Sequence, residues 1–433
     1  MAGPGAMKAR RRLASLVLAG LLAGCAQHAT DDNTLTFWTI GREGEAITQL
    51  LPAFERENPQ IQIRLQQLPL SAAHQKLLTA FAGDSLPDMT QLGNTWMPEF
   101  VALHALEPLQ SRVAASSVIR PDDYFPSIWA TNVYAGQLYG VPWYVDTRLL
   151  FYRSDVLRAA GFQAPPQDWA QWRRMLAALS HPQQGRYGIL LPTNEYEQLM
   201  SLALQQPDSL LRDGGRYGNF ESAGFKRALA FYVDTFKLQQ APAITNVEAG
   251  NPWSEFGHGV YDFYFSGPWN IGEFRQRLPA AEQDDWNTAP LPGPDGPGAS
   301  VAGGSSLVIF RHATHKEAAW KLIQYLSRPD VQQQFYDLLG DMPPRRSSWA
   351  GGHLHDDPKA LAFREQLERV KPTPAVPEWE RIANEMQLVA AQAVAGNLSI
   401  DQAAAEIDRR ADRILEKRRW VLAHTPLPTE EQP

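Results

Sequence analysis

The amino-acid sequence predicts an α/β protein built on an open sheet. Residues 35–40 (LTFWTI), 61–68 (IQIRLQQL) and 89–92 (MTQL) are short apolar or alternating segments typical of strands. Segments with a helical spacing of apolar residues lie between them, and such alternation of strands and helices is typical of α/β sheets. With 433 residues, of which 44% are apolar, the chain is long enough for two domains or one large one.

The connections between these strands carry the candidate site. A turn at residues 41–45 leads into a helix whose apolar face consists of Ile47, Leu50, Leu51 and Phe54. A second helix is predicted over residues 74–82 and a turn over 83–88. Ligands of open α/β sheets lie beyond the carboxyl ends of strands. The polar and aromatic residues that follow predicted strand ends, or accompany them, are Glu43, Glu45, Asn94, Trp96, Trp143 and Asp146.

Residues 139–153 (YGVPWYVDTRLLFYR) concentrate rings and charges in one short stretch. Trp143, Tyr144, Asp146 and Arg148 lie within six residues, and the apolar string that follows is typical of a buried strand. Flat rings and groups that donate or accept hydrogen bonds in fixed directions suit a polyol such as a sugar. The same residues could instead form a strand whose rings lie in the core and whose Asp146–Arg148 pair is a surface salt bridge.

After residue 155 the sequence is mainly helical. A helix that Ser154 can cap comes first, residues 208–219 are a predicted loop, and short strands are expected at 263–265 and 305–310. The other helices are predicted at 169–179, 198–205, 222–236, 253–257, 315–326, 330–338, 378–395 and 400–417.

The 13 Trp residues divide into two groups. Those among apolar neighbours on predicted strands or helices are expected in the core, and they are Trp38, Trp129, Trp172 and Trp320. Those at predicted strand ends or loop edges could face a cleft, and they are Trp96, Trp143, Trp253, Trp269 and Trp379. Within the second group, Trp269 is the foremost candidate for a ligand contact.

The N-terminus has the features of a signal peptide. A basic segment around Arg10–Arg12 precedes an apolar segment at 13–22, which is too short to span a bilayer. The sequence Leu22-Ala23-Gly24-Cys25 then resembles the bacterial lipobox, in which cleavage precedes a Cys that becomes lipid-modified. Cys25 is the single Cys of the chain, so no intrachain disulfide is expected.

These features predict a protein tethered to a bacterial membrane, in the periplasm or at the cell surface. The signal peptide is expected at residues 1–24, the lipid at Cys25 and a tether of small and polar residues at 25–34. A plain secretory signal with an incidental Cys is the alternative. The formal net charge of −7 argues against a nucleic-acid-binding protein.

Catalytic and metal-binding motifs were considered as a competing class. The sequence has no G-x-S-x-G, H-E-x-x-H, P-loop or G-x-G-x-x-G motif. His353 and His355 form an isolated H-x-H, which is more typical of a solvated loop than of a metal site. Asp146 with Glu43 or Glu195 could supply the two carboxylates of a glycoside hydrolase, although any chain with 47 acidic residues offers such pairs. We expect neither an enzyme, nor a cofactor, nor a metal.

A series of segments carries a family resemblance over nearly the whole chain after the signal peptide. In order, the segments are FWTIGREGE, LPDMTQLGNTWMPEF, YGVPWYVDTRLLFYRSDVL, FSGPWNIGEF, APLPGPDG, AGGSSLVIF, KEAAWKLIQYLSRPDVQQQF and MPPR. This series resembles the extracellular solute-binding proteins of bacterial ABC importers. Within them it is most similar to the family that binds maltose, trehalose and related sugars. The order of the segments, rather than any one of them, makes the resemblance specific.

The resemblance implies a two-lobed periplasmic-binding-protein fold of type II, with discontinuous α/β lobes joined by a hinge and a ligand clamped between them. Crossings between the lobes are implied near 144–146, near 303–306 and within 347–355. The implied N-terminal lobe comprises residues 35–144 and 305–347, and the C-terminal lobe comprises 145–304 and 348–433.

The resemblance also implies ligand contacts. It assigns them to Glu43, Tyr144, Asp146, Tyr196, Trp269 and Arg345. Asn94 and Trp96 join this set because they follow a predicted strand, and Arg148 joins it as the guanidinium among the rings and charges of residues 139–153. Carboxylates accept hydrogen bonds from hydroxyls, Arg donates a fork of N–H groups, and rings pack on the apolar face of a pyranose.

Two departures from the family pattern leave the identity of the sugar open. Gly93-Asn94 stands where relatives have an Asp before V-x-W, and Gly303-Gly304-Ser305 stands where they have G-G-W. A sister family takes glycerol-3-phosphate-type ligands, for which Arg42, Arg148 and Arg345 are the candidate cations. A maltose- or trehalose-type α-glucoside is the foremost expectation, with an exported glycan hydrolase as a further alternative. The implied partners are the sugar and the membrane permease of an ABC importer, and we expect a monomer.

Overall fold

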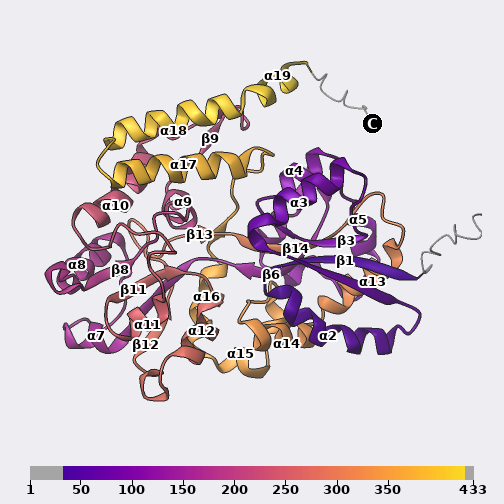
Figure 1. Ribbon diagram of the computed structural model, residues 1–433, viewed down its shortest axis with the longest axis horizontal. Coiled ribbons are helices and arrows are strands. Elements are labelled where there is room, and N and C mark those ends of the chain that lie inside the picture. Colours follow the sequence, from indigo (N-terminus) through magenta and orange to yellow (C-terminus); the bar gives the residue numbers. More distant parts are fainter. Residues whose placement is uncertain (1–32, 425–433) are drawn as a thin grey trace, which may run out of the picture.

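The computed structural model describes residues 33–424 and has two lobes (Figure 1). Each lobe has its own main sheet, with five strands in one and four in the other. This is the two-lobed α/β fold that the sequence predicted. The predicted signal peptide (1–24), the predicted lipid attachment at Cys25 and all but the last two residues of the predicted tether (25–34) lie outside the described residues.

The five-stranded sheet has the order β2-β1-β3-β14-β6. Strand β1 pairs in parallel with β2 and β3, whereas β14 is antiparallel to β3 and β6. The strands predicted at 35–40, 61–68 and 89–92 are therefore confirmed. The strands are β1 (Thr34–Ile40), β2 (Gln62–Leu68), β3 (Met89–Gly93), β6 (Val141–Asp146) and β14 (Gly303–Ile309).

Helices cover both faces of this sheet because alternate side chains of a strand point to opposite faces. Leu307 and Ile309 of β14 pack in one apolar cluster with residues of α2, α13 and α14, whereas Val308 packs in another with residues of α3 and α4. The helices of this lobe are α2 (Glu43–Glu57), α3 (Leu70–Ala82), α4 (Met97–Ala102), α5 (Gln110–Ala114), α6 (Pro126–Ala130), α13 (Lys316–Leu326) and α14 (Pro329–Leu339).

The four-stranded sheet has the order β12-β7-β11-β8. Strand β7 is antiparallel to both β11 and β12, and β11 runs parallel to β8. The apolar string after Arg148 is thus a central, buried strand, as its composition predicted. The strands are β7 (Leu149–Arg153), β8 (Tyr187–Leu190), β11 (Tyr261–Ser266) and β12 (Trp286–Ala289).

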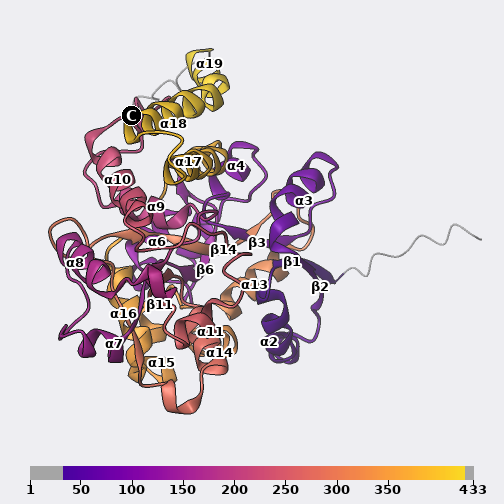
Figure 2. The same cartoon turned by 60° about the vertical axis from the view of Figure 1, so that its left-hand side comes forward.

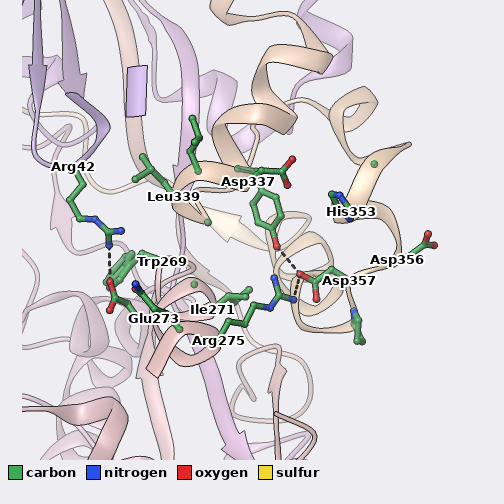
Figure 3. Close-up of a pocket in the computed structure, with 17 residues that line it drawn as sticks. Arg42, Trp269, Ile271, Glu273, Arg275, Asp337, Leu339, His353, Asp356 and Asp357 are labelled. Carbon is green, nitrogen blue, oxygen red and sulfur yellow. Dashed lines mark hydrogen bonds and ion pairs between the residues drawn. The ribbon is translucent and has the colours of Figure 1, made fainter. Parts of the chain in front are cut away.

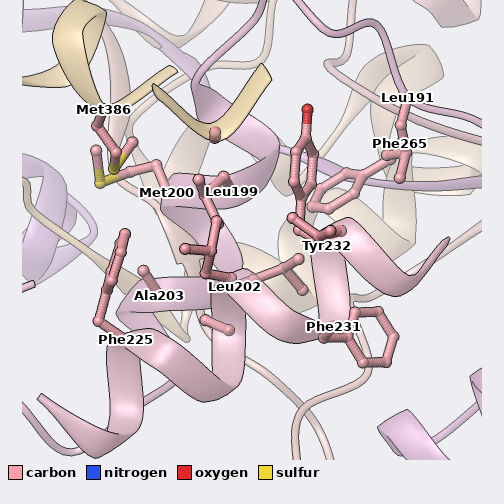
Figure 4. Close-up of a cluster of buried hydrophobic side chains, with 14 of the residues drawn as sticks. Leu191, Leu199, Met200, Leu202, Ala203, Phe225, Phe231, Tyr232, Phe265 and Met386 are labelled. Atoms are coloured by element: carbon pink, nitrogen blue, oxygen red, sulfur yellow. The ribbon is translucent and has the colours of Figure 1, made fainter. Parts of the chain in front are cut away.

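The second lobe is rich in helices, as predicted from the sequence after residue 155. Its largest apolar cluster joins α9 and α10 to the sheet and to Met386 of α17 (Figure 4). The helices are α7 (Ser154–Ala159), α8 (Trp169–Leu179), α9 (Glu197–Leu204), α10 (Ala223–Lys237), α11 (Pro252–Gly257), α12 (Asn270–Arg277), α15 (Gly352–Asp356), α16 (Pro358–Leu367), α17 (Trp379–Val394), α18 (Ile400–Ile414) and α19 (Glu416–His424).

Neighbouring chain segments join the two sheets. Strand β6 of the first sheet is followed after two residues by β7 of the second, and β14 begins beside Asp146. The backbone N–H of Val145 also donates to the carbonyl of Met342, at 2.8 Å, so the segment after α14 lies along β6. The implied division of the lobes at 144/145, 304/305 and 347/348 stays a prediction.

Some local features differ from the sequence-based expectation. Residues 208–219 contain a short hairpin, β9 (Leu211–Arg212) with β10 (Tyr217–Gly218), where a loop was predicted. The helix predicted at 400–417 is interrupted at Leu415, between α18 and α19. The other short strands are β4 (Val133–Tyr134), β5 (Gln137–Leu138), β13 (Ser300–Val301) and β15 (Val370–Lys371).

The Trp residues are distributed differently from the prediction. Trp143 is only 2% exposed and Trp379 is fully buried, so neither faces a cleft, although both lie at element edges in the sequence. Trp172 and Trp320 are buried as expected, whereas Trp38 and Trp129 are half-buried. Within residues 33–424, no helix has the length and apolar character needed to cross a bilayer.

Candidate ligand-binding site

Three of the predicted site residues meet where β6 leaves the first sheet. Glu43 begins α2, directly after the turn that follows β1, while Tyr144 and Asp146 lie on β6. The Tyr144 hydroxyl hydrogen-bonds the Glu43 carboxylate. The same hydroxyl oxygen accepts hydrogen bonds from Gln91 Nε2 and Ser305 Oγ, both at 3.0 Å. These contacts hold the ring and the carboxylate in fixed positions.

Arg148 links this cluster to the second lobe. Its guanidinium is ion-paired with Asp146 and lies 3.3 Å from Glu197 Oε1 on α9. The predicted Asp146–Arg148 pair therefore forms, but Arg148 is only 6% exposed and the pair is not a surface salt bridge. Burial alone would lower the pKa of Arg148, but the charges of Asp146, Glu197 and Glu195 raise it above its usual value. Arg148 thus stays charged in the site.

Trp269 lies over Arg148 at the start of α12. The guanidinium carbon is 4.8 Å from the centre of the indole ring, a cation–π contact. The ring folds back over Gly267, where an added Cβ would lie 2.0 Å from it, so only Gly leaves room for this orientation. Trp269 is half-buried and also lines a cavity. It therefore combines a fixed aromatic face with access from outside.

The cavity has a volume of about 850 Å³ and lies between α12, α14 and α15 (Figure 3). At one end, Arg42 forms an ion pair with Glu273, 2.8 Å from Nη1 to Oε1. This pair joins the start of α2 to α12 and so connects the two lobes. At the other end, Asp357 accepts hydrogen bonds from Arg275 and Tyr336. The volume of the cavity is within the range of small-molecule pockets, but of the nine predicted ligand contacts only Trp269 lines it.

Three carboxylates lie close together in the site. Besides Glu43 and Asp146, the structure adds Asp341, which follows α14. Burial, and then the negative charges of Glu43 and Asp146, raise the pKa of Asp341 well above its usual value. Burial is also the main cause that raises the pKa of Glu43, against the hydrogen bond from Tyr144 and the charge of Arg42. The site is therefore rich in hydrogen-bond acceptors.

Tyr196 lies on a second contact between the lobes, and Asn94 and Trp96 flank Thr95 in that contact. The Tyr196 hydroxyl is 3.3 Å from Glu380 Oε2 at the start of α17, and Thr95 also hydrogen-bonds Glu380. Burial is the main cause that raises the pKa of Glu380. Figure 2 shows α17 beside α4, the helix that follows Trp96.

Asn94 and Trp96 have different surroundings within that contact. Asn94 is buried; its Oδ1 accepts from Ser306 Oγ at 3.2 Å, and its Nδ2 has no partner within residues 33–424. The Trp96 ring packs 4.9 Å from the His74 ring. The Nδ2 group of Asn94 is therefore free to donate a hydrogen bond to a ligand, whereas the ring of Trp96 packs against another side chain of the protein.

Arg345 is the predicted residue that the structure places neither in the cluster around Tyr144 nor at the contact around Glu380. Its Nε lies 2.8 Å from Asp123 Oδ2, and its Nη1 donates to the carbonyl of Ser327. The residue is 5% exposed. A ligand contact by Arg345 stays a prediction that these internal contacts do not favour.

Several site residues were not predicted from the sequence. Gln91 and Ser305 hold Tyr144, Glu197 pairs with Arg148, and Asp341 and Glu380 come from distant segments. Gln91 carried a usable signal, because it lies in the predicted third strand next to its end. The described residues contain no group of three or more His, Cys, Asp or Glu that could hold a metal ion.

Comparison with known proteins identifies the family. The family model described as bacterial extracellular solute-binding protein matches residues 49–362. The structure of the sugar-binding protein MalE from Xanthomonas citri is 53% identical, covers 91% of this chain and 100% of that one, and superimposes with a TM-score of 0.88. The mannitol-binding protein of Pseudomonas aeruginosa is 26% identical over 412 residues, which are 89% of this chain and 93% of that protein. An ABC transporter solute-binding protein from Thermotoga lettingae, bound with α-D-tagatose, is 25% identical, covers 88% of this chain and 100% of that one, and has a TM-score of 0.77. The chain belongs to the bacterial extracellular solute-binding proteins.

Proposed function

We propose that this protein is the sugar-binding component of an ABC importer and that it clamps a disaccharide or short oligosaccharide between its lobes. The observation that carries the proposal is the arrangement of Trp269, Arg148 and the carboxylates of Glu43 and Asp146 at the junction of the two sheets. An aromatic face, a guanidinium fork and fixed acceptors are the groups that recognise a pyranose. The 53% identity to a sugar-binding MalE supports a sugar ligand, and we propose a maltose- or trehalose-type α-glucoside as that sugar.

The proposed mechanism of ligand binding follows from the distribution of the site residues between the two lobes. Glu43 and Tyr144 belong to the first lobe, whereas Trp269 and Glu197 belong to the second. A ligand that touches both sets binds best when the lobes are closed, so it shifts the population toward the closed form. Closure then presents a joint surface to the permease. The proposed lipid at Cys25 would keep the receptor at the membrane where the permease lies.

A thermal-shift screen of residues 26–433 tests this function. The ligands are maltose, trehalose, maltotriose, sucrose and glycerol-3-phosphate. A ligand at about 100 times its dissociation constant adds about 2.7 kcal/mol of stability. We expect a rise of the melting temperature with an α-glucoside that is lost in Asp146→Ala. A shift with glycerol-3-phosphate alone would assign the protein to the sister family instead.

Recovery of the ligand separates a receptor from a glycan hydrolase. The three carboxylates that could form a hydrolytic pair are engaged with the protein: Asp146 pairs with Arg148, Glu43 accepts from the Tyr144 hydroxyl, and Glu195 accepts from Asn246 Nδ2 at 2.7 Å and from Gln198. We therefore expect maltose, trehalose and maltotriose to be recovered unchanged after prolonged incubation. Release of glucose that depends on Asp146 would favour the hydrolase.

A further inference from the structure

Asp341 is a buried carboxylate without a hydrogen bond or ion pair to any part of the chain that the structure describes. It follows Gly340, which ends α14 in the left-handed region with φ +83°. Its side chain is 8% exposed. Burying a charged group is unfavourable unless it is paired or hydrogen-bonded. An unpartnered acid in the site therefore requires an explanation.

The groups around Asp341 do not supply a partner. Glu43 and Asp146 carry the same charge as Asp341 and raise its pKa. The charge of Asp341 in turn helps to raise the pKa of Tyr144. Among residues 33–424, Arg42 is the cation whose charge opposes the raised pKa of Asp341, but its guanidinium is ion-paired with Glu273. Asp146 is in turn paired with Arg148. Glu43 and Asp341 are thus two neighbouring carboxylates that form no ion pair within residues 33–424.

The backbone holds Asp341 in this position. The next residue, Met342, accepts a 2.8 Å hydrogen bond from the N–H of Val145, which lies between Tyr144 and Asp146 on β6. Glu43 is held by the Tyr144 hydroxyl. These contacts place the backbone of Asp341 beside β6 and the carboxylate of Glu43 beside Tyr144.

We propose that Asp341 is a ligand-contacting residue which, with Glu43, forms a two-carboxylate subsite that accepts hydrogen bonds from neighbouring hydroxyls of a neutral sugar and excludes anionic ligands. This inference rests on the proposed function and names its ligand class. At pH values at which they are ionised, the two carboxylates only accept hydrogen bonds, and sugar hydroxyls can donate them. The oxygens of a phosphate or uronate also only accept, and their charge is repelled by the pair. The subsite thus selects neutral sugars over their phosphorylated or oxidised forms.

The test compares a neutral sugar with its phosphate on matched variants. Trehalose and maltose, and trehalose 6-phosphate and maltose 1-phosphate, are titrated at pH 8 into the wild type, Asp341→Asn and Glu43→Gln. Asp295→Asn, an identical change at an exposed position in the second lobe, is the control. Circular dichroism of each variant confirms that it is folded before titration.

We expect the wild type to bind at least one neutral sugar about 100-fold more tightly than its phosphate. Asp341→Asn should lower the ratio of the affinity for the neutral sugar to the affinity for its phosphate at least about tenfold, chiefly by improved binding of the phosphate. Glu43→Gln should lower the same ratio. Asp295→Asn should leave the ratio within about twofold. A merely structural role of Asp341 would change the affinities for both ligands by the same factor.

Three results would overturn the inference. The first is an unchanged ratio in Asp341→Asn, which leaves the proposed function intact if the wild type binds a neutral sugar. The second is a wild type that prefers the phosphate. The third is a wild type that binds none of the neutral sugars, which would overturn the proposed function as well.

Discussion

At the scale of single residues, Trp269 is the side chain whose proposed contact with the ligand can be tested most directly. Its ring is held between Gly267 and Arg148 and is half-buried. A pyranose stacked on the ring would lose that contact in Trp269→Ala, whereas Trp269→Phe keeps an aromatic face. We expect the dissociation constant for the best α-glucoside to rise at least about tenfold in Trp269→Ala and less in Trp269→Phe, measured by calorimetric titration. Equal affinities for wild type and Trp269→Ala would remove Trp269 from the site.

The buried carboxyl group of Asp262, on β11, is expected to make the free energy of unfolding depend on pH. Its side chain is buried and neither carboxylate oxygen has a hydrogen-bond partner in the described chain. Burial raises the pKa of Asp262 from 3.8 to about 6, against the opposing charges of Arg186 and Arg153. The folded state therefore binds more protons than the unfolded state between these values, so this contribution to stability is present below pH 3.8 and is lost as the pH rises through about 6.

Removing the charge should remove this pH dependence. Relative to the wild type, the free energy of unfolding of Asp262→Asn should change in the variant's favour by roughly 2.5 kcal/mol between pH 4 and pH 8. Urea denaturation at both pH values measures the difference. A difference between the two proteins that does not vary with pH would contradict the account, and Asp295→Asn serves as the control for a generic charge effect.

The residues that could be predicted are those that follow strand ends. Glu43, Tyr144 and Asp146 come together because β1 and β6 carry them to the same region of one sheet. Asp341 and Glu197 could not be placed in this way, since each follows or begins a helix far away in the sequence. Trp143 was predicted as a residue that could face a cleft, but its side chain lies in the core. Its position before Asp146 and Arg148 in the sequence gives no indication of that orientation.

At the scale of elements, α2 and α12 are joined across the lobes by the Arg42–Glu273 pair. Arg42 is 57% exposed, so the pair is expected to contribute at most about 1 kcal/mol. If the pair favours the closed form, Arg42→Ala should weaken sugar binding up to about fivefold, with little change in the free energy of unfolding. Titrations of Arg42→Ala, Glu273→Ala and the double variant give the coupling between the two residues.

Salt provides an independent check of the same pair. Screening weakens exposed ion pairs, so the effect of Arg42→Ala on affinity should shrink between 0.01 M and 1 M salt. Equal effects of the two single variants and no extra loss in the double variant would support a pairwise contact. Additive effects would show that the two residues act separately.

Elements with a clear apolar period were predicted well. The spacing of Ile47, Leu50, Leu51 and Phe54 gave α2, and all four side chains are buried. The short hairpin of β9 and β10 was missed because two-residue strands carry no periodic signal. Helix α12 was missed as well, although Trp269 at its start was identified as a candidate.

At the scale of the whole molecule, the lobes are linked by segments that are remote in the sequence. Strands β6 and β14 complete the first sheet, although each lies beside residues that enter the second lobe. No local pattern predicts such pairing, because it depends on contacts between residues more than 150 positions apart. The two-lobed arrangement could therefore be anticipated through the family resemblance but not from periodicity.

The contacts between the lobes lie on two sides of the candidate site. Arg42–Glu273 joins α2 to α12, and Glu380 of α17 meets Thr95 beside α4. The aromatic, cationic and acidic groups of the site lie between lobes that these contacts connect. If the lobes close on a ligand as proposed, the elements that contact the ligand are also those that join the lobes.

A calorimetric titration of residues 26–433 with maltose and with trehalose is the decisive experiment for the proposed function. We expect saturable binding of one of these sugars with one site per chain, recovery of the sugar unchanged, and loss of binding in Asp146→Ala. An absence of binding to both sugars, together with a folded protein, would contradict the proposed α-glucoside. Binding that persists unchanged in Asp146→Ala would contradict the proposed site.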